Sequence, residues 1–369
     1  MKKDEFFDDQ NRLTTAKIKI FEKYIEGYLP KLLITFKKLI IVDLFCGAGK
    51  NGEKDGSPLV LINTINKVLK SNHLSKNDLE VLVLFNDQKR ENIKNLKSEL
   101  EKINYDDSII KITTKSKKYE NYIDTFIEKQ QAKKYRNYSK FIFLDPFTYS
   151  NVKMDDLNRL MRIKNTEILL FLPIFHSYRF SNVDFDEGHK TKVFMKEFTT
   201  KGVHEYNNII EFMFSIRKKL IKDVKIDFVR PVLLDGGARK NALFLLTKHE
   251  KGMLLMNTVM FKNSDDGFRL ITDNLNQDTL FKADEFSSYL ENFKTIFINR
   301  LKKKSFSNKK IVDFTIKEGF LPKQSNKILK ELYDKNKLVV LDNNGNKITN
   351  KNKWNIAVEI RHITRFEWK

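Results

Sequence analysis

The chain has 369 residues, of which 41% are hydrophobic, so it is long enough for one large α/β domain and a smaller second one. Its single cysteine, Cys46, excludes an internal disulfide and a cysteine-cluster metal site, and its six histidines show no zinc-binding spacing. The chain has no long apolar run and no apolar leader, which predicts a cytoplasmic protein without a membrane partner.

The formal net charge of +21 favours a polyanionic partner. Each Lys or Arg near a phosphate releases condensed counterions, so a strongly basic chain binds DNA or RNA well. The chain is also rich in Asn and Ile, a composition that a low-GC genome produces whatever the function. Nucleic acid is therefore a first expectation that needs support from motifs.

Residues 1–37 are predicted to form a helical cover ahead of the first strand. From Asp8 to Phe36, apolar residues such as Phe21, Ile25 and Leu29 recur at helical spacing. The pattern indicates one long helix or two consecutive helices that break at Pro30.

The stretch from Lys38 to Pro58, KLIIVDLFCGAGKNGEKDGSP, is the centre of the predicted fold. Its apolar run 39–42 predicts a strand, and Gly47 and Gly49 let the following backbone approach a ligand closely. The loop lacks the Lys-[Ser/Thr] ending of a P-loop, and its polar tract 50–56 is unlike a helix packed directly on a strand. An ATPase and a dinucleotide fingerprint are therefore both disfavoured.

The loop's D-x-F-x-G-x-G pattern resembles motif one of class I S-adenosylmethionine-dependent methyltransferases. Asp43 would hold the loop or reach the cofactor's amino group through water; the alternative is a local cap at the strand end. Asp87 stands where such folds place an acid for the ribose hydroxyls, and the compatible alternative is a helix cap. The candidate cofactor residues are Asp43, Phe45, Gly47, Gly49, Ser57 and Asp87.

Further strands are predicted at 81–85, 109–112, 141–144 and 168–172, with helices between them. An insertion over 174–222 follows, and then an antiparallel pair at 224–234 and 242–246. This alternation predicts an α/β fold, a mostly parallel sheet with helices on both faces, over residues 38–262. The strand set matches the seven-stranded Rossmann-like sheet of class I methyltransferases.

The fourth strand ends in Asp145, Pro146 and Phe147, the candidate catalytic residues. They resemble the D-P-P-[YFW] loop of amino-methylating nucleic-acid enzymes, in which the acid accepts the target NH₂ hydrogens and the ring stacks on an extruded base. Here the second proline is missing, and Phe147 comes one place early. The alternative is that Phe147 packs under the sheet edge.

Other chemically capable residues have weaker support. Cys46 lies inside the glycine turn, so a buried small side chain is favoured over a nucleophile. His176, Tyr178 and Arg179 follow the fifth strand and either line the substrate side or stabilise a polar loop. With one cysteine and scattered histidines, the sequence predicts no metal site.

Residues 263–369 are predicted to form a winged helix. Two helices, at 309–317 and 322–334, precede a hairpin of strands 338–341 and 354–358. The candidate nucleic-acid contacts are Lys302, Lys303, Lys304, Lys323, Lys327 and Lys330. Recognition helices contact phosphates with such side chains; the alternatives are a solvated face and a protein-docking module.

Nearly the whole chain resembles the bacterial three-Cys-motif partner protein family. The resemblance rests on FDDQNRLTTAKIKIFEKYIEGYLP, IVDLFCGAGK with KDGSPLVLIN, FIFLDPFTYS, LFLLTKHEKGMLLM and FLPKQSNKILKEL. It implies a methyltransferase-like domain, a C-terminal winged helix and a partner with a three-cysteine motif. The chain departs from the family at Cys46 and near Thr148, and its third strand ends in Thr113, Thr114 and Lys115, without an acid to read adenine.

Two functions are therefore weighed. The first is an S-adenosylmethionine-dependent methyltransferase that acts on an exocyclic amine or a hydroxyl of a nucleic acid. The alternative is a catalytically silent subunit that binds DNA, RNA or a protein partner in a larger complex, for example in phage defence. A nuclease has little support, because no carboxylate cluster is placed to bind Mg²⁺.

Overall fold

The computed structural model describes residues 3–71, 78–237, 239–264, 266–271, 282–350, 354, 356 and 364–369. The chain divides into two compact units. The first comprises Met1–Met260 and Phe268–Asp273, and the second comprises Phe261–Gly267 and Asn274–Lys369. Among the described helices, none combines the length and the apolar character that crossing a bilayer requires.

The first unit is built on an eight-stranded sheet of order β10-β8-β9-β7-β6-β1-β4-β5. Its strands are β1 Lys38–Asp43, β4 Glu80–Asn86, β5 Ile110–Lys115, β6 Ser139–Leu144, β7 Thr166–Leu172, β8 Phe228–Asp235, β9 Lys240–Thr247 and β10 Arg269–Ile271. Strand β9 is antiparallel to both of its neighbours, and the other pairings are parallel. From β5 to β8 this is the class I methyltransferase sheet, as predicted; β10 is an additional edge strand.

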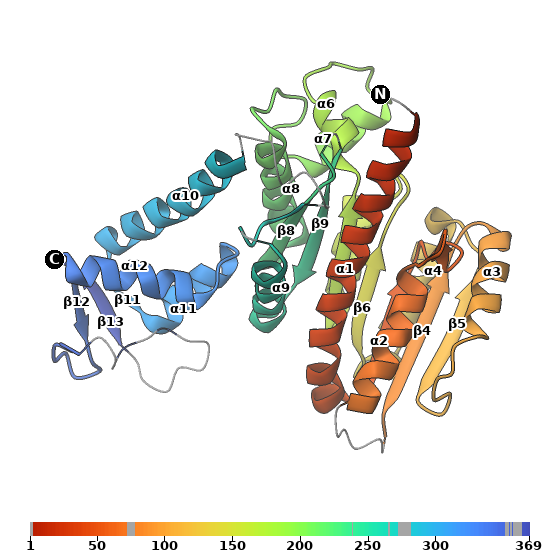
Figure 1. The fold of residues 1–369 in the computed structure, drawn as a ribbon, viewed down its shortest axis with the longest axis horizontal. Coiled ribbons are helices and arrows are strands. Elements are labelled where there is room, and N and C mark those ends of the chain that lie inside the picture. The colour runs from red at the N-terminus through yellow and green to blue at the C-terminus, as the bar shows by residue number, and fades with distance from the viewer. Residues whose placement is uncertain are drawn as a thin grey trace. The chain divides into compact units, whose positions relative to one another are not determined.

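Helices cover both faces of the sheet (Figure 1). They are α1 Lys3–Phe36, α2 Ser57–Ser71, α3 Arg90–Leu100, α4 Tyr119–Gln131, α5 Met154–Arg162, α6 Ile174–Arg179, α7 Lys190–Phe198, α8 Ile209–Val224 and α9 Glu250–Asn263, with a short 3₁₀ helix at Lys133–Tyr135. One face packs against α1, α2, α3 and α9 in a continuous apolar core. The other face carries α4, α5 and α8, with α5 in contact with both α4 and α8.

The N-terminal segment is one helix that continues through Pro30, so the break expected there is absent. Pro30 removes one helix hydrogen bond, but Ile25, Leu29 and Leu33 on either side of it are fully buried against the sheet. Phe21 also packs against Phe143 of β6, with ring centroids 4.7 Å apart and the rings tilted by 34°. Tertiary burial therefore outweighs the local preference of proline.

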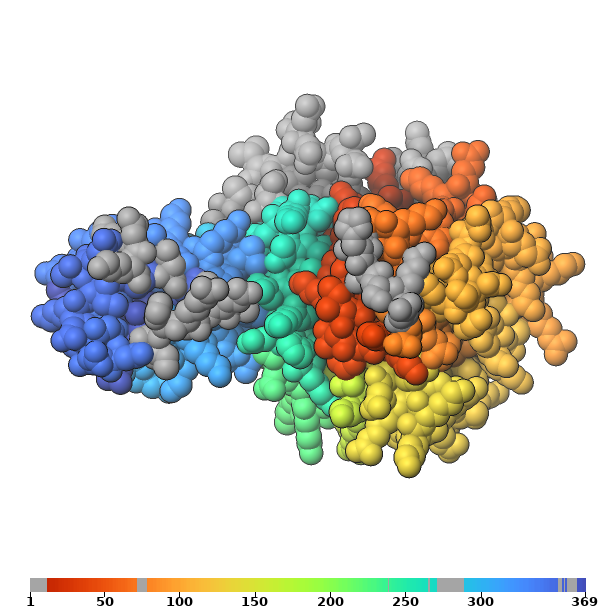
Figure 2. All heavy atoms as spheres, turned by 90° about the horizontal axis from the view of Figure 1, so that it is seen from below, coloured from red at the N-terminus to blue at the C-terminus, as the bar shows by residue number. Residues whose placement is uncertain are grey.

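The two ends of the sheet differ in what surrounds them. In Figure 1 the carboxyl ends of the parallel strands point to the top, where α6 and α7 also lie. Figure 2 looks onto the opposite edge, where the ends of α1 and α2 gather. Any site that follows the predicted loops therefore lies at the upper edge in Figure 1.

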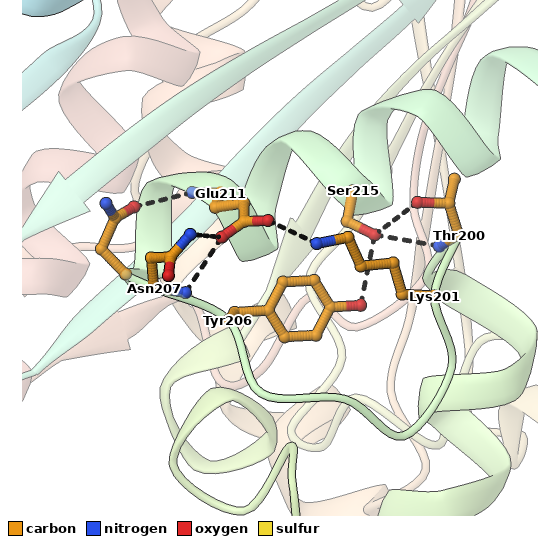
Figure 3. Close-up of polar contacts among 7 residues, drawn as sticks. Thr200, Lys201, Tyr206, Asn207, Glu211 and Ser215 are labelled. Atoms are coloured by element: carbon orange, nitrogen blue, oxygen red, sulfur yellow. Dashed lines mark hydrogen bonds and ion pairs between the residues drawn. The ribbon is translucent and has the colours of Figure 1, made fainter.

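The predicted insertion folds into α6, α7 and α8, and a polar network fixes the loop between α7 and α8 (Figure 3). Ser215 on α8 accepts a hydrogen bond from the backbone N–H of Thr200 at 2.9 Å, and the Tyr206 hydroxyl lies 3.3 Å from it. Glu211 pairs with Lys201 at 2.7 Å and accepts from the backbone of Asn207. The loop thereby holds α7 against α8.

The second unit is a winged helix. Its elements are α10 Lys282–Lys303, β11 Phe306–Ser307, α11 Asn308–Lys317, α12 Pro322–Asp334, β12 Leu338–Leu341 and β13 Arg365–Trp368, and its strand order is β11-β13-β12. Aromatic rings fill its core; those of Phe293 and Phe320 lie 4.0 Å apart. Of the predicted strand 354–358, only Trp354 and Ile356 are described; the partner of β12 in the structure is β13.

Candidate functional site

The glycine turn after β1 leaves a gap beside Gly47. Gly47 and Gly49 both have positive φ, 65° and 89°, a conformation that favours glycine. A Cβ at Gly47 would meet nothing within 4 Å, whereas one at Gly49 would press on Leu96 Cδ1 at 3.0 Å. Gly47 therefore faces open space, and Gly49 is needed for packing against α3.

The polar tract that follows the turn is a small hairpin, β2 Lys50–Asn51 and β3 Lys54–Asp55, and not a helix. The Gly56 N–H donates to the Gly49 carbonyl at 2.7 Å and closes the base of this hairpin. Helix α2 begins only after it, at Ser57. The loop thus differs from a dinucleotide fingerprint, as predicted.

Asp43 is buried at the end of β1 and holds the loop from inside. Its carboxylate accepts hydrogen bonds from the Ser57 hydroxyl at 2.6 Å and from the Phe45 N–H at 3.1 Å. Burial raises the pKa of Asp43 to about 7, against the opposing effect of the Ser57 hydrogen bond. Asp43 and Ser57 therefore connect the glycine turn to α2.

Asp87, just after β4, is enclosed by protein donors. Its Oδ2 accepts from the Gly47 N–H at 3.2 Å, and its Oδ1 accepts from the Lys89 N–H at 2.8 Å and from Asn92 at 3.0 Å. The side chain anchors the glycine turn and the start of α3 together, and the residue is only 1% exposed. Oδ1 has two of these donors and Oδ2 has one, so Oδ2 is the oxygen that keeps acceptor capacity for a ribose hydroxyl.

Asn86 is a structural residue of this edge that the sequence did not single out. Its side chain donates to the Leu44 carbonyl at 3.2 Å and to the Lys117 carbonyl at 3.0 Å, and accepts from the Lys117 N–H at 3.1 Å. It ties together the ends of β1, β4 and β5. The sequence feature that could have indicated this role is the position of Asn86 at the end of the apolar strand, directly before Asp87.

Phe45 stacks on Tyr119, the first residue of α4, with ring centroids 5.0 Å apart and an interplanar angle of 25°. Tyr119 is buried and donates to Asp156 at 3.2 Å, and burial raises the pKa of its hydroxyl. Phe45 is only half-buried. The pair gives the carboxyl edge an aromatic surface next to the end of β5. This is the strand end at which the sequence lacks an acid to read adenine.

The loop after β6 presents an ion pair and an exposed ring. Asp145 pairs with Lys17 of α1, and the Lys17 ammonium lies 4.4 Å from the centroid of the Phe171 ring. Pro146 is buried, but Phe147 is 62% exposed. The alternative in which Phe147 packs under the sheet edge is therefore wrong.

Burial of Cys46 raises the pKa of its thiol, so Cys46 is a packing residue and a poor nucleophile. His176 and Arg179 are exposed on α6, while Tyr178 is half-buried near Phe212. Within the part of the chain that the structure describes, no three metal-ligating side chains converge.

The predicted lysines of the winged helix lie on two elements. Lys323, Lys327 and Lys330 of α12 follow i, i+4, i+7 spacing, opposite the buried Ser325, Leu329 and Leu332. Lys302, Lys303 and Lys304 are exposed at the end of α10. Helix α12 is the second helix of the helix-turn-helix, so its outer face is the face that such domains present to DNA.

Comparisons with known proteins gave one family match and several similar solved structures. A family model described as a GMT-like wHTH domain matches residues 271–345. No curated protein matches the chain. Similar solved structures include the delta-N METTL16 methyltransferase domain (9% identity, TM-score 0.32, covering 62% of this chain and 83% of that one) and a human methyltransferase 10 domain containing protein (9%, 0.33, 61% and 80%).

A third is a dimethyladenosine transferase from Plasmodium falciparum, with 13% identity, a TM-score of 0.27 and coverage of 84% of this chain and 96% of that one. Because these TM-scores are low, the fold assignment rests on the strand order of the sheet itself. By that order the first unit has the class I methyltransferase fold, and a winged helix-turn-helix domain follows it.

Proposed function

We propose that this protein binds S-adenosylmethionine beside Gly47 and methylates an exocyclic amine or a hydroxyl of a nucleic acid. The winged-helix domain adds affinity for the polyanion. The observation that carries the proposal is the exposed ring of Phe147, next to the acid Asp145, at the end of the strand that neighbours the glycine turn. An exposed aromatic ring beside an acid at a strand end suits a base taken out of its stack.

The residues of the first unit fit the cofactor in part. The open space beside Gly47 accommodates a ligand close to the backbone, and the Phe45–Tyr119 pair offers an aromatic wall. Asp87 would accept from a ribose hydroxyl through Oδ2, beside the Gly47 N–H. When bound, the sulfonium supplies the methyl group.

The chain's own part in such a transfer is mainly alignment. Asp145 would accept a hydrogen bond from the acceptor amine or hydroxyl, and Lys17 keeps the carboxylate in place. Phe147 would stack on the base and fix its plane. Methyl transfer to a positioned acceptor gains most of its rate from such orientation, so few strong acids or bases are required.

The alternative, a catalytically silent subunit, also has a specific observation in its favour. The carboxylate of Asp87 is enclosed by three protein donors, and that of Asp145 is engaged by Lys17. In this proposal the fold serves as a scaffold in a complex with nucleic acid and a partner bearing a three-cysteine motif. The family resemblance of the sequence supports such a partner, and a role in phage defence would follow from it.

Calorimetric titration with S-adenosylmethionine separates the two proposals. We expect wild type to bind, Gly47→Asp to lose binding and Gly52→Asp to bind like wild type. The last variant is a matched control, because Gly52 also has positive φ, 63°, and open space around it. Asp tolerates this backbone region better than most residues. Absence of heat from wild type at millimolar cofactor would favour the silent subunit.

A further inference from the structure

We propose that a row of five rings beside Phe147 binds the unpaired bases of a single-stranded nucleic acid. The row, called here the aromatic track, consists of Tyr149, His176, Phe180, Phe185 and His189. The inference rests on the proposed function and deepens it, because it selects single-stranded DNA or RNA over duplex as the substrate class of the methyltransferase-fold unit.

The rings of the track contact one another in sequence. Tyr149 and His176 have centroids 6.2 Å apart and an interplanar angle of 21°, and His176 and Phe180 are 4.8 Å apart. Phe180 and Phe185 follow at 6.3 Å, and Phe185 stacks on His189 at 3.9 Å and 13°. Two of these pairs are near-parallel and the other two lie at 47° and 62°, so the rings pack on one another and bases would stack on the outer faces of the exposed rings, not between them.

The track is accessible and begins at the proposed site. Tyr149 is two residues after Phe147, which is 62% exposed. His176 and His189 are exposed, and the other three rings are partly exposed. A base held at Phe147 would therefore have its neighbours along the strand within reach of the track.

The track is also held in place by the fold. The Tyr149 hydroxyl lies 2.9 Å from the Thr191 hydroxyl, and its ring packs on Phe194 at 4.9 Å. His189 accepts a hydrogen bond from the Thr191 N–H through its Nδ1 at 3.3 Å. Rings that are fixed before binding lose little conformational entropy when a base stacks on them.

Charge around the track is balanced. Residues 174–198 contain four basic residues, Arg179, Lys190, Lys192 and Lys196, and four acidic ones, Asp184, Asp186, Glu187 and Glu197. Lys192 pairs with Asp184 at 2.7 Å and with Glu187 at 3.0 Å. Attraction at the track itself would therefore come from stacking and not from phosphate contacts.

Single-stranded nucleic acid fits these features better than a duplex or a protein. In a duplex the base faces are already stacked on one another, and proteins reach unpaired bases by stacking aromatic side chains on them. Arg179 adds a cation beside the row, with its guanidinium carbon 5.9 Å from the Phe180 ring centroid. Two of the five rings are the exposed imidazoles of His176 and His189, whose polar nitrogens suit a base better than an apolar protein surface.

The test measures affinity of the full chain for a fluorescent single-stranded oligonucleotide and for its duplex by anisotropy. Phe185→Leu keeps apolar bulk but removes the ring, and Phe185→Tyr restores a ring. Tyr135→Leu is the matched control, a half-buried aromatic that precedes β6 at the opposite edge. We expect Phe185→Leu to weaken single-strand binding about fivefold or more, with duplex binding unchanged, and Phe185→Tyr and Tyr135→Leu to match wild type.

Equal affinity of Phe185→Leu and wild type for the single strand, or a parallel loss for the duplex, would overturn the track. The track is also refuted if Phe185→Leu binds the oligonucleotide like wild type but no longer binds a protein partner. Calorimetric titration of the same samples with S-adenosylmethionine keeps the two proposals apart. If the cofactor binds and Phe185→Leu keeps wild-type affinity for the single strand, the track alone is refuted. If wild type gives no heat with the cofactor, the proposed function is refuted.

Discussion

The ammonium of Lys17 on α1 pairs with the carboxylate of Asp145 at the end of β6. Two residues earlier, Thr15 accepts a hydrogen bond from Lys54 of the β2–β3 hairpin at 3.3 Å. The N-terminal helix therefore contacts both loops of the proposed site. It contributes to the arrangement of the carboxyl edge as well as covering the sheet.

The first prediction concerns this ion pair. Lys17→Met should lower the free energy of unfolding by about 1–3 kcal/mol, because it leaves a largely buried carboxylate without its partner. The side chains of Lys17 and Asp145 are 10% and 19% exposed. Urea denaturation of Lys17→Met, Asp145→Asn and the double variant gives the coupling energy between them.

Lys23→Met is the matched control on the same helix. Its pair with Glu26 is 39% and 31% exposed, and such surface pairs contribute about 0.5 kcal/mol. If Lys17→Met costs no more than Lys23→Met, or if the double variant shows no coupling, the pair does not position Asp145.

The second prediction is a pH dependence caused by Asp43. Burial raises its pKa to about 7, whereas in the unfolded chain an aspartate titrates near about 4. The folded protein thus holds a proton that the unfolded chain releases between these values, so the free energy of unfolding falls as pH rises through this window. Three pKa units correspond to a loss of about 4 kcal/mol.

Asp43→Asn removes this contribution but keeps an oxygen that accepts from the Phe45 N–H. Urea denaturation at pH 4.5 and 8, values set by that window of about pH 4 to 7, should show a smaller loss for the variant than for wild type. Glu167 and Asp156, whose pKa values burial also raises, remain in both proteins. The difference therefore isolates Asp43, and identical pH profiles would contradict the assignment.

The parts of the fold that the sequence predicts are those set by local pattern. Apolar runs such as 39–42 and 141–144 are strands because both faces of the sheet are covered and every side chain is buried. Their alternation with helices limits the topology to a few choices. The winged helix followed from two amphipathic helices and a predicted hairpin after them, whose first strand, 338–341, is β12.

The parts that the sequence could not predict depend on contacts between distant residues. Whether Asp87 faces a ligand or the protein is decided by Gly47 and Asn92, and no local pattern records those bonds. Tyr119 meets Phe45 only because the ends of β1 and β5 lie at the same edge. The helix break predicted at Pro30 is absent for the same reason, because burial of the neighbouring side chains against the sheet offsets the hydrogen bond that proline removes.

The third prediction concerns Phe147. Because the side chain is 62% exposed, Phe147→Ala should change the free energy of unfolding by less than about 0.5 kcal/mol. If the ring stacks on the target base, the variant should lose about tenfold in methyl transfer from labelled cofactor to nucleic acid. Phe147→Trp should retain most of the activity, and cofactor affinity should not change.

Ile34→Ala is the control for Phe147→Ala. Ile34 is also a large apolar side chain, 70% exposed, near the end of α1 at the opposite edge of the sheet. It should leave both stability and transfer unchanged. Wild-type transfer by Phe147→Ala would remove the ring from the proposed mechanism.

The fourth prediction concerns the outer face of α12. Lys323→Gln with Lys327→Gln should weaken binding of duplex DNA alike for all sequences, because phosphate contacts carry no sequence information. The slope of log affinity against log salt should become shallower by about 1 for each lysine removed. Lys335→Gln with Lys337→Gln removes the same charge from exposed positions at and beyond the end of α12. This control should keep the wild-type slope if α12 itself lies against the phosphates. Equal slopes for the two double variants would contradict the prediction, because the lysines would then act only through net charge and α12 would make no specific contact.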